Sequence, residues 1–185
     1  MKTREKIVKT AQDLIEKKGK MAISISEVAA EIGITHAAIY KYFKNKNELL
    51  QHLAEIWLDE TSQTMFPFDK GDLTNLSDLA HAWLWELARS KKAYYDENPV
   101  KFKLYTDFIG QNENLTQKHT SDLMASYAET TGNTDFVEDF AAYQAFIPFI
   151  DPHYANTWDE QFQVRFEAVW SLVKPYFDEK DLTKK

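Results

Sequence analysis

Residues 24–46 read SISEVAAEIGITHAAIYKYFKNK, and two capping signals in this segment predict two short helices. Ser24, with Glu27 three residues later, forms a capping box, which marks the start of a helix. Gly33 stands where that helix must end, because a residue without a Cβ readily adopts the left-handed backbone of a C-cap. Thr35 caps the second helix. Two helices joined by about three residues are typical of a helix-turn-helix, whose second helix enters the major groove of DNA.

The second of these helices is predicted to have an inward and an outward face. Ile39 and Phe43 recur at helical spacing and face inward. His36 lies at the outward N-terminal end, where it contacts a base or a phosphate, or alternatively is a solvated surface histidine. Tyr42 is equally compatible with a phosphate contact and with packing in the core. The candidate DNA contacts are Ser24, Ser26, Thr35, His36, Ala37, Tyr40, Lys41, Tyr42 and Lys46.

This segment resembles the DNA-binding domain of the TetR family of one-component transcriptional repressors. The family pattern has a Thr-rich cap, Ile-Ala, Gly-Val-Ser, Leu-Tyr, an aromatic residue or His before Phe, and a Lys that opens the next helix. The corresponding residues here are Ser24, Val28-Ala29, Gly33-Ile34-Thr35, Ile39-Tyr40, Tyr42-Phe43 and Lys46. The family usually has Thr where this chain has Ala38, so the hydroxyl contact to phosphate is missing at that position. The motif covers roughly the first quarter of the chain.

Charge is distributed unevenly along the 185 residues, although the net charge is −7. Residues 1–52 carry ten Lys and Arg against six Asp and Glu, so this part is basic and the remainder is strongly acidic. At physiological salt the Debye length is about 8 Å, so a distant acidic body is largely screened from a DNA duplex. The absence of cysteine excludes disulfides and thiolate metal sites and fits a cytoplasmic protein. No membrane span or secretory signal is expected.

The chain as a whole is predicted to be all-α, with a three-helix homeodomain-like head and a body of about six helices. Gly and Pro fall between the helical patterns, which predict a DNA-binding domain over residues 1–46 and an effector-binding and dimerisation domain over residues 47–185. The expected helices cover residues 3–18, 24–33, 35–43, 45–63, 75–97, 99–109, 114–131, 134–147 and 158–177.

The body holds most of the aromatic residues, which either line a ligand pocket or fill the bundle core. The candidate ligand contacts are Trp83, Leu87, Phe102, Tyr105 and Phe108. The expected effector is a small apolar or aromatic molecule, because long basic side chains usually keep their charged ends in water. A strongly anionic effector would require an inward-facing residue among Arg89, Lys91, Lys92, Lys101 and Lys103.

The last two long helices are candidates for a dimer interface, although in a monomer the same residues could form core. In the TetR family such helices pair with their symmetry mates, and a palindromic operator calls for a two-fold dimer. The candidate interface residues are Phe136, Phe140, Tyr143, Phe162, Phe166, Val169, Trp170 and Val173.

No catalytic or metal site is expected. His81, His119 and His153 stand in no metal-binding motif, and the chain has neither a phosphate-binding loop nor a nucleophile elbow. The resemblance therefore implies a homodimeric, ligand-responsive repressor without a cofactor, in which the effector changes the separation of the two heads. One alternative is a dimeric DNA-binding protein whose body binds a protein or no small molecule. The other, a helical enzyme with a homeodomain-like head, lacks a catalytic constellation.

Overall fold

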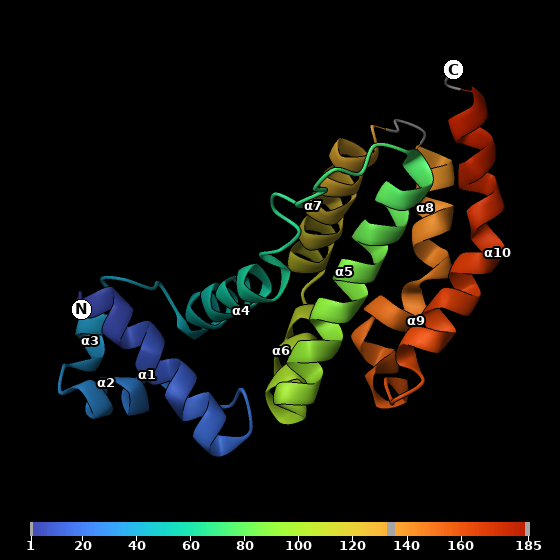
Figure 1. Ribbon diagram of the computed structural model, residues 1–185. Helices are drawn as coiled ribbons and strands as arrows, with labels where there is room; N and C mark the ends of the chain where they lie inside the picture. The colour runs from blue at the N-terminus through green and yellow to red at the C-terminus, as the bar shows by residue number, and fades with distance from the viewer. Residues whose placement is uncertain (1, 133–135, 184–185) are drawn as a thin grey trace. The chain divides into compact units, whose positions relative to one another are not determined.

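The structure is a computed structural model that describes residues 2–132 and 136–183. The regular secondary structure of these residues is helical, which confirms the predicted all-α class (Figure 1). Within the described ranges, no helix is long and apolar enough to cross a membrane. The helices are α1 (Thr3–Lys18), α2 (Ile25–Ile32), α3 (His36–Ile39), α4 (Lys46–Ser62), α5 (Leu76–Glu97), α6 (Pro99–Gly110), α7 (Glu113–Thr131), α8 (Phe136–Ala145), α9 (Ile147–Ile150) and α10 (Phe162–Thr183), with a 3-10 helix η1 over Pro152–Thr157.

The helices pack into two compact units that are not continuous in sequence. Unit 1 comprises Met1–Glu60 and Asn98–Thr116, and unit 2 comprises Thr61–Glu97 and Gln117–Lys185. Unit 1 therefore holds α4 up to Glu60 and all of α6 in addition to the three helices of the head. The predicted boundary after residue 46 separates DNA binding from effector binding and dimerisation. The packing of the helices into two units does not test this division of function, which stays a prediction.

In unit 1, α1 packs on α2 through an apolar stripe. Ile7, Ala11 and Ile15 are buried at helical spacing on α1. The helix ends at Gly19, whose φ of 59° places it in the left-handed region, as the sequence predicts. Lys18 in the last turn of α1 forms an ion pair with Glu27 of α2, so one polar contact links the two helices beside their apolar contact.

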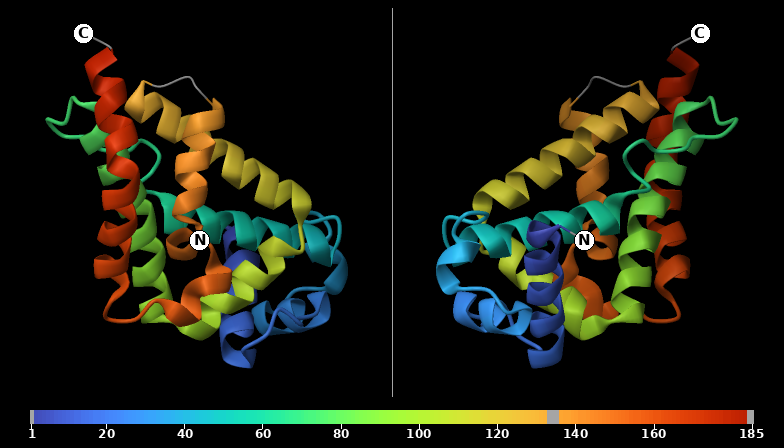
Figure 2. Two further views of the ribbon diagram at one scale, coloured as in Figure 1. Left: turned by 90° about the vertical axis from the view of Figure 1, so that its right-hand side faces the viewer. Right: turned by 90° about the vertical axis from the view of Figure 1, so that its left-hand side faces the viewer.

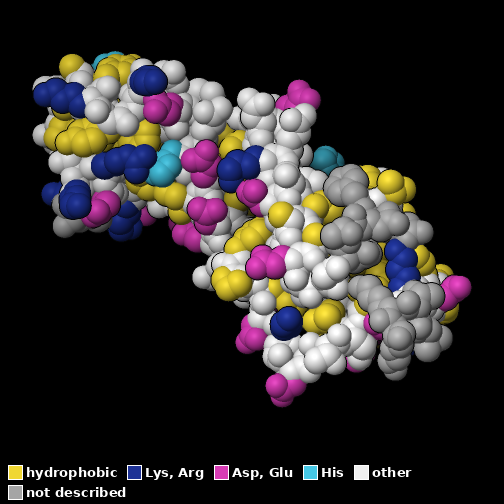
Figure 3. Space-filling view, turned by 90° about the horizontal axis from the view of Figure 1, so that it is seen from above, with side chains coloured by type: hydrophobic (Ala, Val, Ile, Leu, Met, Phe, Trp, Pro, Cys, Tyr) yellow, Lys and Arg dark blue, Asp and Glu magenta, His cyan; other side chains and the backbone are white. Residues whose placement is uncertain are grey.

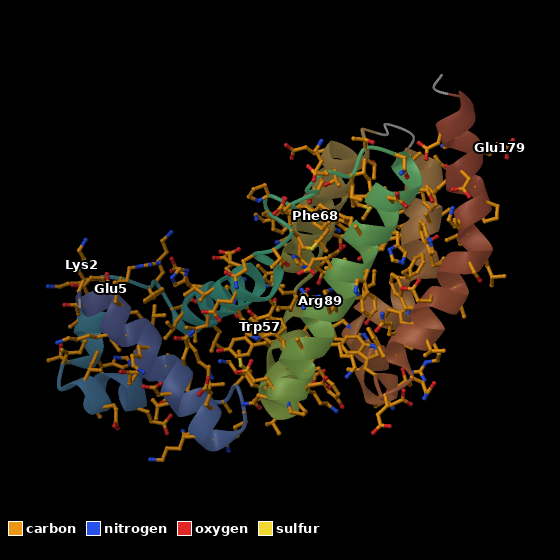
Figure 4. The ribbon with its side chains drawn as sticks, in the orientation of Figure 1. Lys2, Glu5, Trp57, Phe68, Arg89 and Glu179 are labelled. Atoms are coloured by element: carbon orange, nitrogen blue, oxygen red, sulfur yellow. The ribbon has the colours of Figure 1, made fainter. Side chains whose placement is uncertain are left out.

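Aromatic packing places α6 in the same unit as α4, although more than 35 residues separate the two helices. The Trp57 ring stacks on the Tyr105 ring, with centroids 5.5 Å apart and planes 7° apart. Figure 4 labels Trp57 among the side chains of α4. Trp57 also meets the edge of Phe102 at 5.6 Å. Lys101 of α6 pairs with Glu16 of α1 at 2.8 Å. These contacts are long-range, which explains why the sequence pattern did not reveal them.

In unit 2, α5 and α10 run antiparallel and lie side by side in both views of Figure 2. The Asp181 carboxylate near the end of α10 accepts hydrogen bonds from the Leu76 and Ser77 amides, at 2.8 and 3.2 Å. These amides begin α5, so Asp181 caps α5 from a distant part of the chain. Further along, His81 Nε2 lies 3.0 Å from the Glu167 carboxylate.

The predicted start of the last helix differs from the structure. The last helix begins at Phe162 instead of residue 158, because the Asp159 carboxylate accepts a hydrogen bond from the Gln161 amide at 2.8 Å and closes a turn before the helix. Trp158 lies outside α10, and its indole donates to the Pro148 carbonyl at 2.9 Å. The start predicted for the preceding helix, residue 134, lies outside the described residues.

Candidate functional site

The first helix of the predicted helix-turn-helix is formed by local hydrogen bonds. The Ser24 hydroxyl accepts from the Glu27 amide at 3.1 Å, and the Glu27 carboxylate accepts from the Ser24 amide at 2.7 Å. These two bonds confirm the capping box. The Lys18 ammonium and the Ser24 amide lower the pKa of Glu27 to about 2. Gly33 has φ of 70° and ends the helix, as predicted.

The second helix, α3, is short, but its backbone hydrogen bonds continue beyond Ile39. Thr35 caps it, because its hydroxyl accepts from the Ala38 amide at 3.2 Å. The Tyr42 and Phe43 amides both donate to the Ile39 carbonyl, at 2.8 and 3.1 Å. These bonds hold the turn that brings Ile39 and Phe43 into the core of the head, where both are buried as predicted.

The opposite side of α3 and its flanks is accessible. All the candidate DNA contacts are exposed, namely Ser24, Ser26, Thr35, His36, Ala37, Tyr40, Lys41, Tyr42 and Lys46. Tyr42 is 40% exposed, so the alternative in which this ring packs in the core is wrong. Phe43 takes the core position instead. All nine residues thus occupy accessible positions between the N-cap of α2 and the start of α4, while their contacts with DNA stay a prediction.

Two features of the exposed surface around α3 favour contact with an anionic partner. The His36 ring meets the Tyr40 ring edge-on, with centroids 5.0 Å apart and an interplanar angle of 78°, which restricts the orientation of the imidazole. Lys46 is the first residue of α4, where the helix dipole and free amides favour a phosphate. Asn45 and Glu48 cap the same helix, with Asn45 Oδ1 accepting from the Glu48 amide at 2.9 Å. Figure 3 shows several Lys and Arg side chains on the head.

The predicted ligand contacts are divided between the two units. Trp83 and Leu87 belong to unit 2, whereas Phe102, Tyr105 and Phe108 belong to unit 1. The Trp83 indole donates to the Ser126 hydroxyl at 3.1 Å, and burial raises the pKa of Tyr105 to about 12. Four of the five residues are buried and Phe108 is partly exposed, so each has a packing role. Their role in ligand binding stays a prediction.

A hollow of about 350 Å³ lies in unit 2, away from the predicted ligand residues. Its walls come from α9, η1 and α10 and from the residues around them, and none of the five ligand candidates lines it. The lining residues are Pro148, Phe149, Thr157, Trp158, Phe162, Arg165, Ala168 and Val169.

Lys91 departs from the expectation that the basic side chains of this region keep their charged ends in water. Its Nζ donates to the Ile150 carbonyl at 2.9 Å, and Ile150 is a buried residue. Desolvation lowers the pKa of Lys91 to about 8, although Asp151 acts in the opposite direction. The sequence contained a signal for this inward position, because Lys91 continues the buried stripe of Leu84 and Leu87 at intervals of seven and four residues.

The other four basic residues between residues 89 and 103 agree with the expectation that their charged ends are paired or exposed instead of inward. Arg89 pairs with Glu86 at 2.6 Å and Lys92 pairs with Asp96 at 2.5 Å, both within α5. Lys101 pairs with Glu16, and Lys103 is exposed.

The predicted dimer residues fall on two different sides of their helices. Phe162, Phe166 and Trp170 are buried in unit 2 and therefore belong to the core of one protomer, which corrects their assignment to an interface. They recur every four residues and form the inward stripe of α10, where Phe166 meets Trp85 and Phe146 at 4.9 and 4.8 Å. Phe140, Tyr143, Val169 and Val173 are partly exposed, and the side chain of Phe136 lies outside the described residues.

A different apolar set faces outward from the same helices. On α10, Val164 is 62% and Leu172 is 81% exposed, and Ala168 and Pro175 are also exposed. On α8, Val137 is 76% exposed and Ala141 is exposed. We call these six residues the outer apolar face. Sequence periodicity missed this face because α10 carries apolar residues on more than one side.

No metal-binding group of three or more His, Asp or Glu residues occurs in the part of the chain that the structure describes. His81 contacts Glu167, and His153 Nδ1 lies 2.8 Å from the Asp151 carboxylate. His119 lies in a desolvated position near Lys91, and both desolvation and that charge lower the pKa of His119 to about 3.

Comparison with known proteins finds similarity in the first part of the chain. Residues 7–53 match the family described as bacterial regulatory proteins, tetR family. An uncharacterized HTH-type transcriptional regulator in the lacX 3'region of Lactococcus lactis subsp. lactis is 29% identical over 97 residues, which are 50% of this chain and 49% of that protein. The uncharacterized HTH-type transcriptional regulator YerO of Bacillus subtilis (strain 168) is 39% identical over 62 residues, 34% of this chain and 22% of that protein.

The tetracycline repressor protein class C of Escherichia coli is 33% identical over 69 residues, 37% of this chain and 32% of that protein. The chain thus spans half or less of the length of the curated relatives it matches. The family match contains α2 and α3 entirely and ends within α4.

Proposed function

Because the chain belongs to the tetR family of bacterial regulatory proteins through its helix-turn-helix at residues 7–53, we propose that it is a homodimeric transcriptional repressor. It binds a palindromic operator and is released from DNA by a small-molecule effector. The proposal rests on one observation, which is that α3 and the turn after it separate buried residues from exposed ones. Ile39 and Phe43 pack inside the head, while His36, Tyr40 and Lys41 are exposed together.

DNA binding is tested by comparing one phosphate contact with one base contact. Replacing Lys46 by Ala is expected to weaken binding about equally on matched and mismatched operators and to lower the salt slope by about 1, because phosphate contacts carry no sequence information. Replacing His36 by Ala is expected to change the sequence preference. Fluorescence titrations of duplexes from the region upstream of its own gene, at several salt concentrations, measure both effects.

The control for this experiment is Lys118→Ala, which removes an exposed charge from α7 in unit 2. This variant is expected to bind DNA as the wild type does. Equal binding of the wild type to the upstream duplex and to a scrambled duplex at low salt would contradict the operator proposal. An unchanged preference profile for His36→Ala would show that His36 does not read bases.

The outer apolar face supports the homodimer. Contiguous exposed apolar surface is uncommon on monomeric proteins and marks interaction sites. On α10 it comprises Val164, Ala168, Leu172 and Pro175, which recur at helical spacing along one side, and on α8 it comprises Val137 and Ala141, four residues apart. In a two-fold dimer the same patch of each protomer covers the other, so Leu172 of one protomer is buried against α8 or α10 of its partner.

Replacing Leu172 by Glu is expected to convert the dimer into a monomer that keeps its fold. Leu172 is 81% exposed, so the substitution removes little packing within the protomer but introduces a charge into the interface. Sedimentation velocity at micromolar concentration measures the species, and circular dichroism checks the fold. Gln163→Glu, an exposed polar position on the same helix, is the matched control and should remain dimeric. A monomeric wild type would contradict the dimer.

Effector response requires two states of the dimer, only one of which holds the heads at the spacing of successive major grooves. An effector shifts this equilibrium only by as much as its affinities for the two states differ, and a coupling free energy of about 1–3 kcal/mol is typical. By reciprocity, DNA must weaken effector binding by the same factor as the effector weakens DNA binding.

A further inference from the structure

We infer that Arg4, in the first turn of α1, binds the phosphate backbone of DNA and extends the DNA interface beyond the helix-turn-helix. This inference rests on the DNA binding of the proposed function and adds a further contact to it. Arg4 is exposed, and it belongs to the same unit as α2, α3 and the start of α4. None of the nine candidate DNA contacts lies in α1, which ends at Lys18.

The Arg4 side chain lies against the ring of Phe43. On α1, Arg4 precedes the buried residues Ile7, Ala11 and Ile15 at helical intervals, so it continues their inward stripe. The guanidinium carbon is 5.0 Å from the centroid of the Phe43 ring. An arginine in such a position covers apolar surface with its stem while its charged end stays in water. The first turn of α1 therefore places a cation beside the turn that follows α3.

This position is next to residues that are candidates for contact with DNA. Phe43 is 1% exposed, whereas Tyr42 and Lys44 on either side of it are exposed. The Tyr42 and Phe43 amides both donate to the Ile39 carbonyl, so the ring that supports the guanidinium is held in a fixed turn. A DNA backbone that contacts Tyr42 and Lys46 runs past residue 43, within reach of the arginine stacked on it.

Arg4 has no acidic partner among the described residues. None of their carboxylates lies within 4.0 Å of its guanidinium, whereas Lys9 on the same helix is paired with Asp13 at 3.0 Å. The adjacent Glu5 is used as a cap, because its carboxylate accepts from the Lys2 amide at 2.9 Å (Figure 4 labels both residues). A guanidinium carries five N–H donors and the ring contact uses its face, so the donors remain for an anion.

Stabilisation of the head alone does not account for the charge. A methionine would cover the Phe43 ring with a side chain of similar length and no charge. Lys41, Lys44 and Lys46 are exposed and form no ion pair with the described acidic residues, so Arg4 adds a cation to a stretch that already holds three. Like charges gathered in this way repel one another, and a bound polyanion removes that repulsion.

A phosphate fits Arg4 better than a base edge does. A guanidinium binds phosphate oxygens through two parallel hydrogen bonds, and a duplex offers such oxygens along its whole backbone. Base edges are read by the helix that enters the major groove, and Arg4 lies on α1 instead of α3. The contact is therefore expected to add affinity and salt dependence without sequence preference.

Salt titrations of the full-length protein test this contact. The probes are a fluorescent duplex from the region upstream of its own gene and a scrambled duplex. Arg4→Met is expected to lower the slope of log K against log salt by about 0.9 for each protomer bound. It should weaken binding to both duplexes by about tenfold or more, the usual range for a hydrogen bond between charged groups. Arg4→Lys keeps the charge and should keep the slope.

The matched control is Lys6→Met, which removes an exposed cation from the other side of α1. This variant is expected to bind both duplexes with the wild-type salt slope. Thermal unfolding followed by circular dichroism checks that every variant is folded at the temperature of the titration. A wild-type slope for Arg4→Met would overturn the inference, as would an equal fall in slope for Lys6→Met, because the effect would then come from net charge alone.

Neutral phosphates give a readout that a structural role of Arg4 would not change. Each phosphate of the upstream duplex is replaced in turn by an uncharged methylphosphonate. At the phosphate that Arg4 contacts, the replacement is expected to weaken binding by the wild type but not by Arg4→Met, since the two changes remove the same interaction. Lys46→Ala should show this coupling at a different phosphate. Equal effects of every replacement on the wild type and on Arg4→Met would overturn the inference.

The inference and the operator proposal fail in different ways. If the wild type binds both duplexes equally and Arg4→Met has a lower slope on both, the phosphate contact is supported and the operator proposal is contradicted. If the wild type prefers the upstream duplex and Arg4→Met keeps its slope, the operator proposal is supported and the Arg4 contact is overturned. A changed sequence preference in Arg4→Met would overturn the assignment to phosphate, and a wild type that binds neither duplex at low salt would overturn both proposals.

Discussion

Replacing Phe166 by Ala is expected to lower the free energy of unfolding of the protein by about 3–5 kcal/mol, the range for removing a large aromatic side chain from a core. Phe166 is completely buried in unit 2. Its ring contacts four aromatic side chains from α5, α9 and the residue that precedes α9, with centroid separations of 4.8–5.8 Å: His81, Trp85, Phe146 and Phe149. The truncation therefore leaves a cavity that the surrounding rings cannot close without moving.

The matched control lies on the same helix, six residues further on. Leu172→Ala removes an apolar side chain that is 81% exposed, so it should change the unfolding free energy of a protomer by less than about 0.5 kcal/mol. Urea unfolding of both variants, with the m-value checked for constancy, measures the difference. Similar destabilisation by Phe166→Ala and Leu172→Ala would contradict the placement of Phe166 in the core and Leu172 outside it. Replacing Phe166 by a charged residue would therefore unfold the protomer. Loss of the dimer in such a variant would consequently not identify a dimer interface.

Replacing Phe43 by Ala is expected to abolish operator binding by unfolding the head. Phe43 is 1% exposed, the Arg4 guanidinium lies 5.0 Å above its ring, and the His52 ring lies 5.7 Å away. Loss of the ring should lower the unfolding free energy by about 3–5 kcal/mol. Total stabilities of protein domains are only about 5–15 kcal/mol, so a loss of this size removes a large part of the stability that keeps the head folded.

The adjacent residue provides the control. Tyr42→Phe removes only an exposed hydroxyl, so stability should stay within about 0.5 kcal/mol of the wild type, and operator binding should weaken by no more than one hydrogen bond's contribution. Circular dichroism at 222 nm and a fluorescence titration of the operator duplex, performed on both variants, separate folding from binding. Phe43→Ala with wild-type helicity and wild-type operator affinity would contradict the core assignment.

The head could be predicted in detail because its structure depends on contacts between residues three or four positions apart. Ser24 with Glu27, Gly33, and Thr35 with the Ala38 amide each act within one helical turn, and the structure shows all of them as expected. The alternation of Ile39 and Phe43 with exposed residues leaves one possible inward face. Hydrogen bonds within one helical turn depend on residues that are close together in the sequence, so the sequence could predict these capping positions.

The body could be predicted only as a set of helices, because α5 and α10 are apolar on more than one side. Which side becomes core depends on the neighbouring helices that are present, and these are distant in sequence. Packing against α5 and α9 made Phe166 core and left Leu172 outside. Stacking on Trp57 placed α6 in the unit of the head.

Lys91 illustrates the same limit for a functional group. Its position on the apolar stripe of α5 was visible in the sequence, but a long basic side chain there can either extend to water or remain inside. The Ile150 carbonyl, 59 residues further along the chain, provides the acceptor that holds the ammonium inward. The sequence alone therefore established the helix-turn-helix and the helical class, since both arise from local hydrogen bonds and periodicity. The inward charge, the outer apolar face and the two units depended on long-range packing. The hydrophobic pattern of a helix with several apolar sides does not indicate which side is buried, and only contacts with distant helices decide it.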